Sequence, residues 1–256
     1  MSSEDILTLA APKADARAAY GTDANQFVDL RMAHGKGPHP AAICLHGGYW
    51  RAKYDLAYLG HLCAAFAGRG VATVNVEYRR VGNAGGGWPG TFADVRAAYQ
   101  FVIQNASRYS IDVRRVIVLG HSAGGQLALC LAAHESGLHA AISLAGVVDL
   151  QHAYELHLSN DAVVEFLGGT PRDVADHYRE ADPMRLAIRS RQYLLHGVKD
   201  EDVPPQLSRN YAQAKANEDV RLTMLEGAGH FELVDPRSQA WAEVSENILE
   251  AAGKRL

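Results

Sequence analysis

The chain has 256 residues, of which 48% are hydrophobic and 21% charged, with a formal net charge of -4. This composition is typical of a globular protein with a large core, and it excludes a disordered or low-complexity chain. No basic stripe, no apolar run of membrane-spanning length and no secretory signal is present, so we expect neither a nucleic-acid nor a membrane partner.

Short apolar runs typical of strands alternate with helix-patterned segments along most of the chain. The predicted strands are residues 41–45, 72–76, 116–119, 140–145, 192–195 and 221–225. The predicted helices are residues 56–67, 92–104, 126–133, 206–215 and 239–252. This alternation predicts an α/β fold, in which helices cover both faces of a mostly parallel sheet. We expect one domain over residues 1–256, with its functional groups at the carboxyl ends of strands.

The sequence His-Gly-Gly-Tyr-Trp at 46–50 follows the first of these strands directly. Small residues at such a position let backbone N–H groups face a substrate oxygen without obstruction. We therefore predict an oxyanion-binding loop whose donors are the N–H groups of Gly48 and Tyr49. Two aromatic residues, Trp50 in this loop and Trp88 in the glycine-rich loop after the second strand, are predicted to contact substrate. The alternative for the glycine-rich loop is a plain surface connection.

The sequence Gly120-His121-Ser122-Ala123-Gly124 lies between the predicted strand 116–119 and the predicted helix 126–133. A sharp turn from strand to helix holds its serine in strained backbone space with the hydroxyl exposed. This nucleophile elbow makes Ser122 the predicted nucleophile. The N–H group of Ala123, at the start of the helix, is the predicted second arm of the oxyanion hole.

Residues from about 150 to 183 interrupt the alternation of strands and helices, and this segment is long for a simple connection. We predict a short helical cap over the sheet edge. A substrate lid and a surface insertion remain equal interpretations of it.

The last two predicted strands are each followed by a candidate partner for the serine. Three carboxylates lie together after residues 192–195, of which Asp200 is the favoured acid and Asp202 the alternative. His230, in a loop of small residues after 221–225, is the predicted base. The resulting chain order of Ser122, Asp200 and His230 is the one expected of a serine hydrolase built on a parallel sheet.

Metal and cofactor sites are not indicated. The histidines show no zinc-binding spacing, and the three cysteines, Cys44, Cys63 and Cys130, are an odd number in apolar segments. Buried thiols without a disulfide framework are typical of a reducing compartment. We therefore expect a cytoplasmic protein without metal or cofactor.

These motifs resemble those of the α/β-hydrolase superfamily. The loop at 46–50, the elbow Gly120-His121-Ser122-Ala123-Gly124-Gly125 and Gly229-His230-Phe231-Glu232 are similar to the branch with kynurenine formamidases and hormone-sensitive-lipase-like carboxylesterases. Tyr20-Gly21, followed by residues 26–29, resembles the first strands of that branch. The short cap at 150–183 departs from the lipase-like members.

The resemblance implies a two-step acyl transfer on a small-molecule substrate. The first hypothesis is a serine hydrolase of small carboxylic esters with short acyl chains. The alternative is an arylformamidase acting on N-formylkynurenine, since a formyl group needs almost no acyl pocket. A third hypothesis, of another class, is a hydrolase-fold binding protein without turnover. A substrate panel separates the first two, and an active-site serine probe tests the third.

Overall fold

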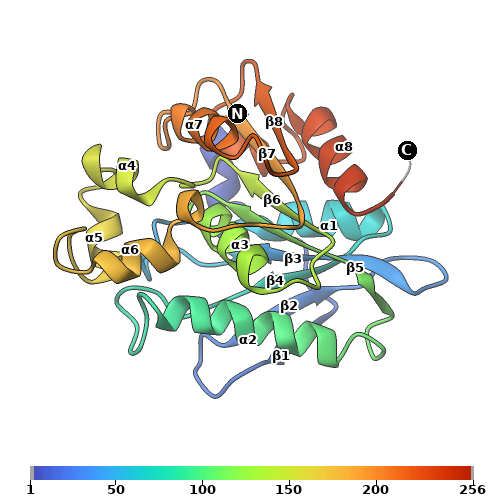
Figure 1. Ribbon diagram of the computed structural model, residues 1–256. Helices are drawn as coiled ribbons and strands as arrows, with labels where there is room; N and C mark the ends of the chain where they lie inside the picture. The colour runs from blue at the N-terminus through green and yellow to red at the C-terminus, as the bar shows by residue number, and fades with distance from the viewer. Residues whose placement is uncertain (1–2, 255–256) are drawn as a thin grey trace.

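The computed structural model describes residues 3–254, which are built around one eight-stranded sheet (Figure 1). The strands are β1 (Ala16–Ala19), β2 (Phe27–Arg31), β3 (His39–Leu45), β4 (Ala72–Val76), β5 (Ile111–His121), β6 (Ala140–Leu144), β7 (Arg191–Gly197) and β8 (Val220–Leu225). Their order across the sheet is β1-β2-β4-β3-β5-β6-β7-β8. The β1–β2 and β2–β4 pairs are antiparallel, and the remaining neighbours are parallel, which confirms the predicted sheet.

Helices cover both faces of the sheet, as the α/β pattern predicts. They are α1 (Gly60–Gly68), α2 (Gly90–Gln104), α3 (Ala123–His134), α7 (Gln206–Ala214) and α8 (Trp241–Ala251). Side chains of α1 and α8 share one core cluster, and those of α2, α3 and α7 share the other. Alternate residues of β5 enter the two cores, with Val116 and Val118 on one face and Ile117 and Leu119 on the other. Burial on both faces explains why residues 116–119 of this strand are all apolar.

The excursion predicted at 150–183 consists of short helices, which lie together at one end of the sheet in Figure 1. They are α4 (Leu150–Glu155), α5 (Ala162–Leu167), α6 (Ala175–Ala181) and the 3-10 helix η3 (Pro183–Arg185). Phe166 of α5 joins a group of aromatic residues that we call the cap aromatic cluster. The cluster has two stacked pairs, Trp50 with Phe166 and Trp88 with Phe92, and Trp88 meets Phe166 edge to face. The rings of Trp50 and Phe166 stack with centroids 4.4 Å apart.

Several elements differ from the sequence prediction. The strands β1 and β2 lie before the first strand that hydrophobic runs predict. Such runs do not reveal these two strands, because β1 is a half-exposed edge strand and β2 contains two charged residues. The predicted helix 56–67 starts as a 3-10 turn, η2 (Ala57–Leu59), and continues as α1. Leu59 and Gly60 both have right-handed helical dihedral angles, so the two segments join without a break. Two more 3-10 helices, η1 (Ser3–Leu7) and η4 (Phe231–Leu233), were not predicted.

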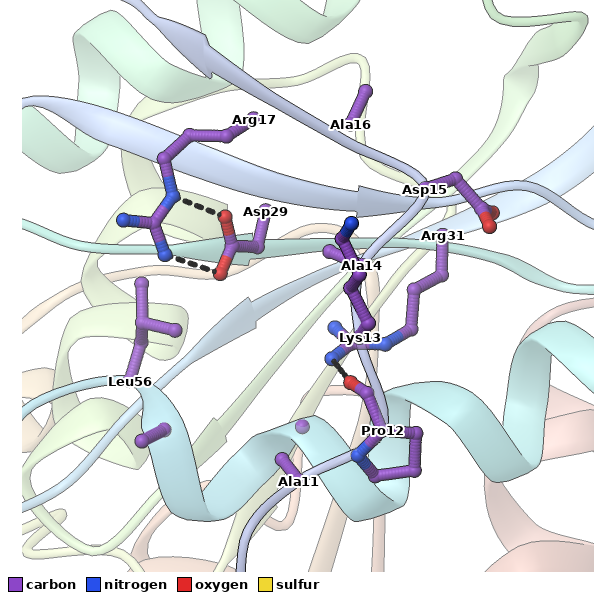
Figure 2. Close-up of a pocket in the computed structure, with 12 residues that line it drawn as sticks. Ala11, Pro12, Lys13, Ala14, Asp15, Ala16, Arg17, Asp29, Arg31 and Leu56 are labelled. Carbon is purple, nitrogen blue, oxygen red and sulfur yellow. Dashed lines mark hydrogen bonds and ion pairs between the residues drawn. The ribbon is translucent and has the colours of Figure 1, made fainter.

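A cavity of about 530 Å³ lies beside β1 and β2 (Figure 2). Arg17 closes one side of it through two hydrogen bonds to Asp29, from Nε at 2.6 Å and Nη2 at 2.8 Å. On the other side, Nη2 of Arg31 donates to the carbonyl oxygen of Pro12 at 2.5 Å. Across residues 3–254, no helix is both long enough and apolar enough to pass through a membrane.

Candidate active site

The nucleophile elbow joins β5 to α3, as predicted. Ser122 lies between them with φ 56°, a left-handed conformation that is costly for a residue with a Cβ atom. A side chain at Gly120 would collide with the carbonyl oxygen of Gly124, and one at Gly124 with that of Leu45. The two glycines therefore allow the elbow to close tightly against the end of β3, and this packing holds the serine in its strained conformation.

The loops after β7 and β8 bring Asp200 and His230 into contact. Nδ1 of His230 lies 2.7 Å from Oδ2 of Asp200, and both side chains are buried. A carboxylate oxygen only accepts, so Nδ1 carries a proton and a neutral His230 leaves Nε2 free to act as a base. The structure thus brings the predicted acid and base together, 30 residues apart in sequence.

The surroundings of Asp200 distinguish it from Asp202. Oδ1 of Asp200 accepts hydrogen bonds from the backbone N–H groups of Asp202 at 2.9 Å and Val203 at 2.8 Å. Burial alone would raise the pKa of the Asp200 carboxyl, but hydrogen bonds from His196 and His230 outweigh it and lower that pKa below its usual range. Asp202 is exposed and makes no hydrogen bond to His230 among residues 3–254.

The loop after β3 has three consecutive residues with positive φ, which are Gly48 at 108°, Tyr49 at 50° and Trp50 at 57°. Within the described chain, the N–H groups of Gly48 and Tyr49 donate to no other group, as an oxyanion site requires. The hydroxyl of Tyr49 donates to the backbone carbonyl of Asp202 at 2.6 Å, which ties this loop to the acid loop. Ala123 opens α3, so its N–H group lies in the first helical turn, where such groups have no intrahelical partner.

Several of these groups line a cavity of about 240 Å³, which we call the catalytic cavity. Among the residues that line it are Gly48, Tyr49, Ser122, Asp202 and His230. No hydrogen bond joins Ser122 Oγ to His230 in the described part of the chain, but such contacts often tighten only when substrate binds.

The sequence analysis missed part of the wall of the catalytic cavity. Leu7 of η1, Tyr54, Tyr58 of η2 and Phe231 of η4 also line it. The one available signal was proximity in sequence, since Phe231 follows His230 and the two tyrosines follow the oxyanion loop. Nothing in the local sequence indicates that Leu7 reaches the site.

Trp50 and Trp88, the two predicted substrate contacts, lie elsewhere. Trp50 is fully buried in the cap aromatic cluster, and its Nε1 donates to Oε1 of Gln126 at 3.0 Å. Trp88 stacks on Phe92 and is not among the residues that line the catalytic cavity. The strained turn at 48–50 directs the indole of Trp50 toward the cap, so the geometry gives a substrate contact no support.

Asp200, Asp202 and His230 are a group whose ligand atoms lie within 4.8 Å of one another, which is close enough to hold a metal ion. However, both oxygens of Asp200 already accept hydrogen bonds, from two backbone N–H groups and from two histidines. An ion here would have to replace the His230–Asp200 contact. The expectation of a metal-free site therefore stays a prediction, which treatment with a chelator would test.

Comparisons with known proteins agree with this architecture. Residues 28–214 match the model of the BD-FAE family. A probable isoprenylcysteine alpha-carbonyl methylesterase of Arabidopsis thaliana is 22% identical to this chain. The match covers 90% of this chain and 54% of that protein. A shorter match, 35% identical over 41% of this chain, covers 27% of neutral cholesterol ester hydrolase 1 of Rattus norvegicus. The chain thus spans about half, or less, of the length of these curated relatives.

Solved structures show the same fold. A truncated carbohydrate esterase from gut microbiota superposes with a TM-score of 0.79 at 21% identity. The superposition covers 94% of this chain and 98% of the chain of that esterase. A thermophilic esterase of Thermogutta terrifontis gives a TM-score of 0.75 at 24% identity over 92% of this chain and 90% of its own. With the parallel sheet, the elbow and the match over residues 28–214, the chain belongs to the BD-FAE family and has the α/β-hydrolase fold.

Proposed function

We propose that this chain hydrolyses small carboxylic esters with Ser122 as nucleophile, His230 as base and Asp200 as the acid that orients the base. The observation that carries the proposal is the 2.7 Å contact of His230 Nδ1 with Asp200, in a cavity that His230 shares with the strained Ser122. The relatives described as a methylesterase and a cholesterol ester hydrolase support ester chemistry.

In the first step, Nε2 of His230 takes the proton of the Ser122 hydroxyl as Oγ attacks the ester carbonyl carbon. The negative charge that develops on the carbonyl oxygen is stabilised by the N–H groups of Gly48, Tyr49 and Ala123. When the tetrahedral intermediate collapses, the alcohol leaves with the proton held by His230, and the acyl group stays on Ser122. Asp200 stabilises the positive charge of His230 throughout this step.

In the second step, water takes the place of the alcohol. His230 accepts a proton from the water as its oxygen attacks the acyl carbon, and the same oxyanion donors stabilise the second intermediate. The proton then returns to Ser122 Oγ as the carboxylic acid is released. No cofactor enters either step, and each proton that His230 accepts is returned.

The size of the catalytic cavity favours small substrates. Its volume of about 240 Å³ is below the range of roughly 300–1,000 Å³ of pockets for drug-sized ligands. The rings of Tyr54, Tyr58 and Phe231 provide a mainly aromatic wall for the acyl or alcohol group. We therefore expect acetyl and butyryl esters to be turned over faster than decanoyl esters.

The test is a panel of p-nitrophenyl acetate, butyrate and decanoate on the wild type and on Ser122→Ala. We expect the variant to lose on the order of 10⁴- to 10⁶-fold in kcat. Equal rates in the two proteins would show that Ser122 is not the nucleophile. A fluorophosphonate probe should label the wild type and leave the variant unlabelled, whereas a wild type that resists labelling would favour a binding protein without turnover.

The arylformamidase alternative gains no support from the relatives named above, whose descriptions concern esters. Adding N-formylkynurenine to the same panel tests it directly. We expect its kcat/KM to be lower than that of p-nitrophenyl acetate, and a higher value would overturn the ester assignment while keeping the serine mechanism.

A further inference from the structure

Tyr58, which the sequence analysis did not select, contacts two segments of the proposed catalytic machinery. Its hydroxyl oxygen lies 2.6 Å from the backbone nitrogen of Gly47, in the oxyanion loop, and 2.9 Å from Nδ1 of His121, in the nucleophile elbow. On the far side of the same imidazole, Nε2 of His121 lies 3.1 Å from the carbonyl oxygen of His230. All of these groups are buried, with Tyr58 at 6% exposure.

Elementary donor and acceptor chemistry gives a direction to each of these hydrogen bonds. A carbonyl only accepts, so Nε2 of His121 must carry the proton that reaches His230. In a neutral imidazole Nδ1 is then an acceptor, so the Tyr58 hydroxyl donates to Nδ1 of His121. The oxygen of Tyr58 meanwhile accepts from the backbone N–H of Gly47, which only donates.

The surroundings of His121 favour the same neutral form. Burial, reinforced by the nearby His230, holds the pKa of the His121 imidazole well below its usual range. The rings of His121 and His230 lie with their centroids 4.5 Å apart. When His230 becomes positively charged during acyl transfer, a neutral neighbour at this distance adds no repulsion, whereas a charged one would oppose the proton transfer.

We propose that Tyr58 and His121 form a positioning relay that sets the place of the oxyanion loop and of His230 relative to Ser122. This inference rests on the proposed function. The three segments follow β3, β5 and β8, so no local turn fixes their spacing. The relay links them through buried hydrogen bonds from Gly47 to the backbone of His230. Tyr58 acts through these partners rather than on the substrate carbonyl, and it is a positioning residue.

The kinetic test compares Tyr58→Phe with a matched control, Tyr211→Phe. Each substitution keeps the ring and removes a buried hydroxyl. Tyr211 donates to Oε1 of Gln192 at 2.6 Å and does not line the catalytic cavity. For p-nitrophenyl acetate we expect Tyr58→Phe to lower kcat by about 10- to 100-fold, since small displacements of reacting groups have effects of this size. We expect its KM to stay within about twofold, and Tyr211→Phe to keep the wild-type kcat.

A kcat within twofold of the wild type in Tyr58→Phe would overturn the relay, and so would an equal loss in Tyr211→Phe, which would indicate general destabilisation. These outcomes are distinct from failure of the proposed function, in which Ser122→Ala keeps wild-type activity.

A spectroscopic readout on the wild type decides the case even where Tyr58→Phe does not fold. Long-range ¹H–¹⁵N spectra of ¹⁵N-histidine-labelled protein report which ring nitrogen carries the proton, and the His121 signals are assigned by their loss in His121→Gln. We expect the neutral tautomer protonated on Nε2 at pH 7. A proton on Nδ1, or a charged ring, would contradict the hydrogen-bond directions on which the relay depends.

Discussion

Two neighbouring residues of the oxyanion loop lead into two regions with opposite properties. Tyr49 lines the catalytic cavity, where the N–H groups of Gly48 and Tyr49 donate to no group within residues 3–254 and Ser122 is strained. Trp50 enters the cap aromatic cluster, where its ring is stacked and its N–H is hydrogen-bonded. The difference shows that adjacent aromatic residues of one predicted catalytic motif can face different regions, since Trp50 does not line the cavity. Substitutions in the first region should therefore change rate, and those in the second should change stability.

The largest effect is expected from the acid. Asp200→Asn replaces the carboxylate that holds Nδ1–H of His230, so we expect kcat/KM to fall by about 10⁴-fold. Asp202→Asn should lower it by less than about tenfold, because Asp202 reaches the site through its backbone carbonyl. Steady-state rates with p-nitrophenyl acetate measure both. If the two effects were exchanged, Asp202 would be the acid.

A stability effect is expected at the base of the cap, where the buried carboxylate of Asp182 accepts backbone N–H groups of Leu150 at 3.2 Å and Met184 at 3.1 Å. Burial is the main cause that raises the pKa of the Asp182 carboxyl to about 6, above its ordinary value of 3.8. Between these two pH values the folded protein binds more protons than the unfolded chain. This group's contribution to stability is therefore highest below pH 4 and falls as the pH rises through 6.

From that shift, the wild type should lose about 2 kcal/mol in unfolding free energy relative to Asp182→Asn between pH 4 and 7. Urea unfolding of both proteins across this range gives the comparison. If the unfolding free energies of the two proteins changed with pH in the same way, the pKa of Asp182 would not be raised by folding.

A smaller effect tests the cap aromatic cluster itself. Trp50→Phe leaves Oε1 of Gln126 without its donor and removes part of the ring stacked on Phe166. We expect the unfolding free energy to fall by about 1–3 kcal/mol, while KM for p-nitrophenyl acetate stays within about twofold. A several-fold rise in KM without loss of stability would instead support the substrate contact predicted from the sequence.

The smallest effect is expected at the 530 Å³ cavity, which is larger than the catalytic cavity but shares no lining residue with it. Arg17→Ala breaks the ion pair with Asp29, in which the arginine side chain is 60% exposed. Such a pair contributes at most about 1 kcal/mol. Thermal unfolding and ester turnover should therefore both stay close to the wild type, and a marked loss of turnover would show that this cavity also contributes to activity.

The parts that local sequence could predict are those that follow buried strands. The elbow and the His-Gly-Gly loop come directly after apolar runs, and His230 follows β8 by a short loop of small residues. A parallel sheet brings such strand ends to one edge. Asp200 and Asp202 remained alternatives because both belong to the same loop. Their difference depends on two backbone N–H groups that turn toward Asp200, and residue order does not reveal that turn.

The parts that could not be predicted depend on long-range packing or on unusual backbone conformations. The direction of Trp50 follows from three consecutive positive φ angles, two of them at residues other than glycine. Tyr58 looks like an ordinary helix residue until the fold places its hydroxyl between Gly47 and His121. In both cases the deciding contact joins segments that carry no shared sequence signal.

The short helix η1 has a practical consequence for anyone who expresses this protein. Ile6 is fully buried, while Glu4 and Leu7 line the catalytic cavity. A substitution in η1, or any change that displaces this helix, would therefore alter the wall of the catalytic cavity. Kinetic constants measured on such a variant would describe a different cavity, so η1 should be kept intact when the protein is assayed.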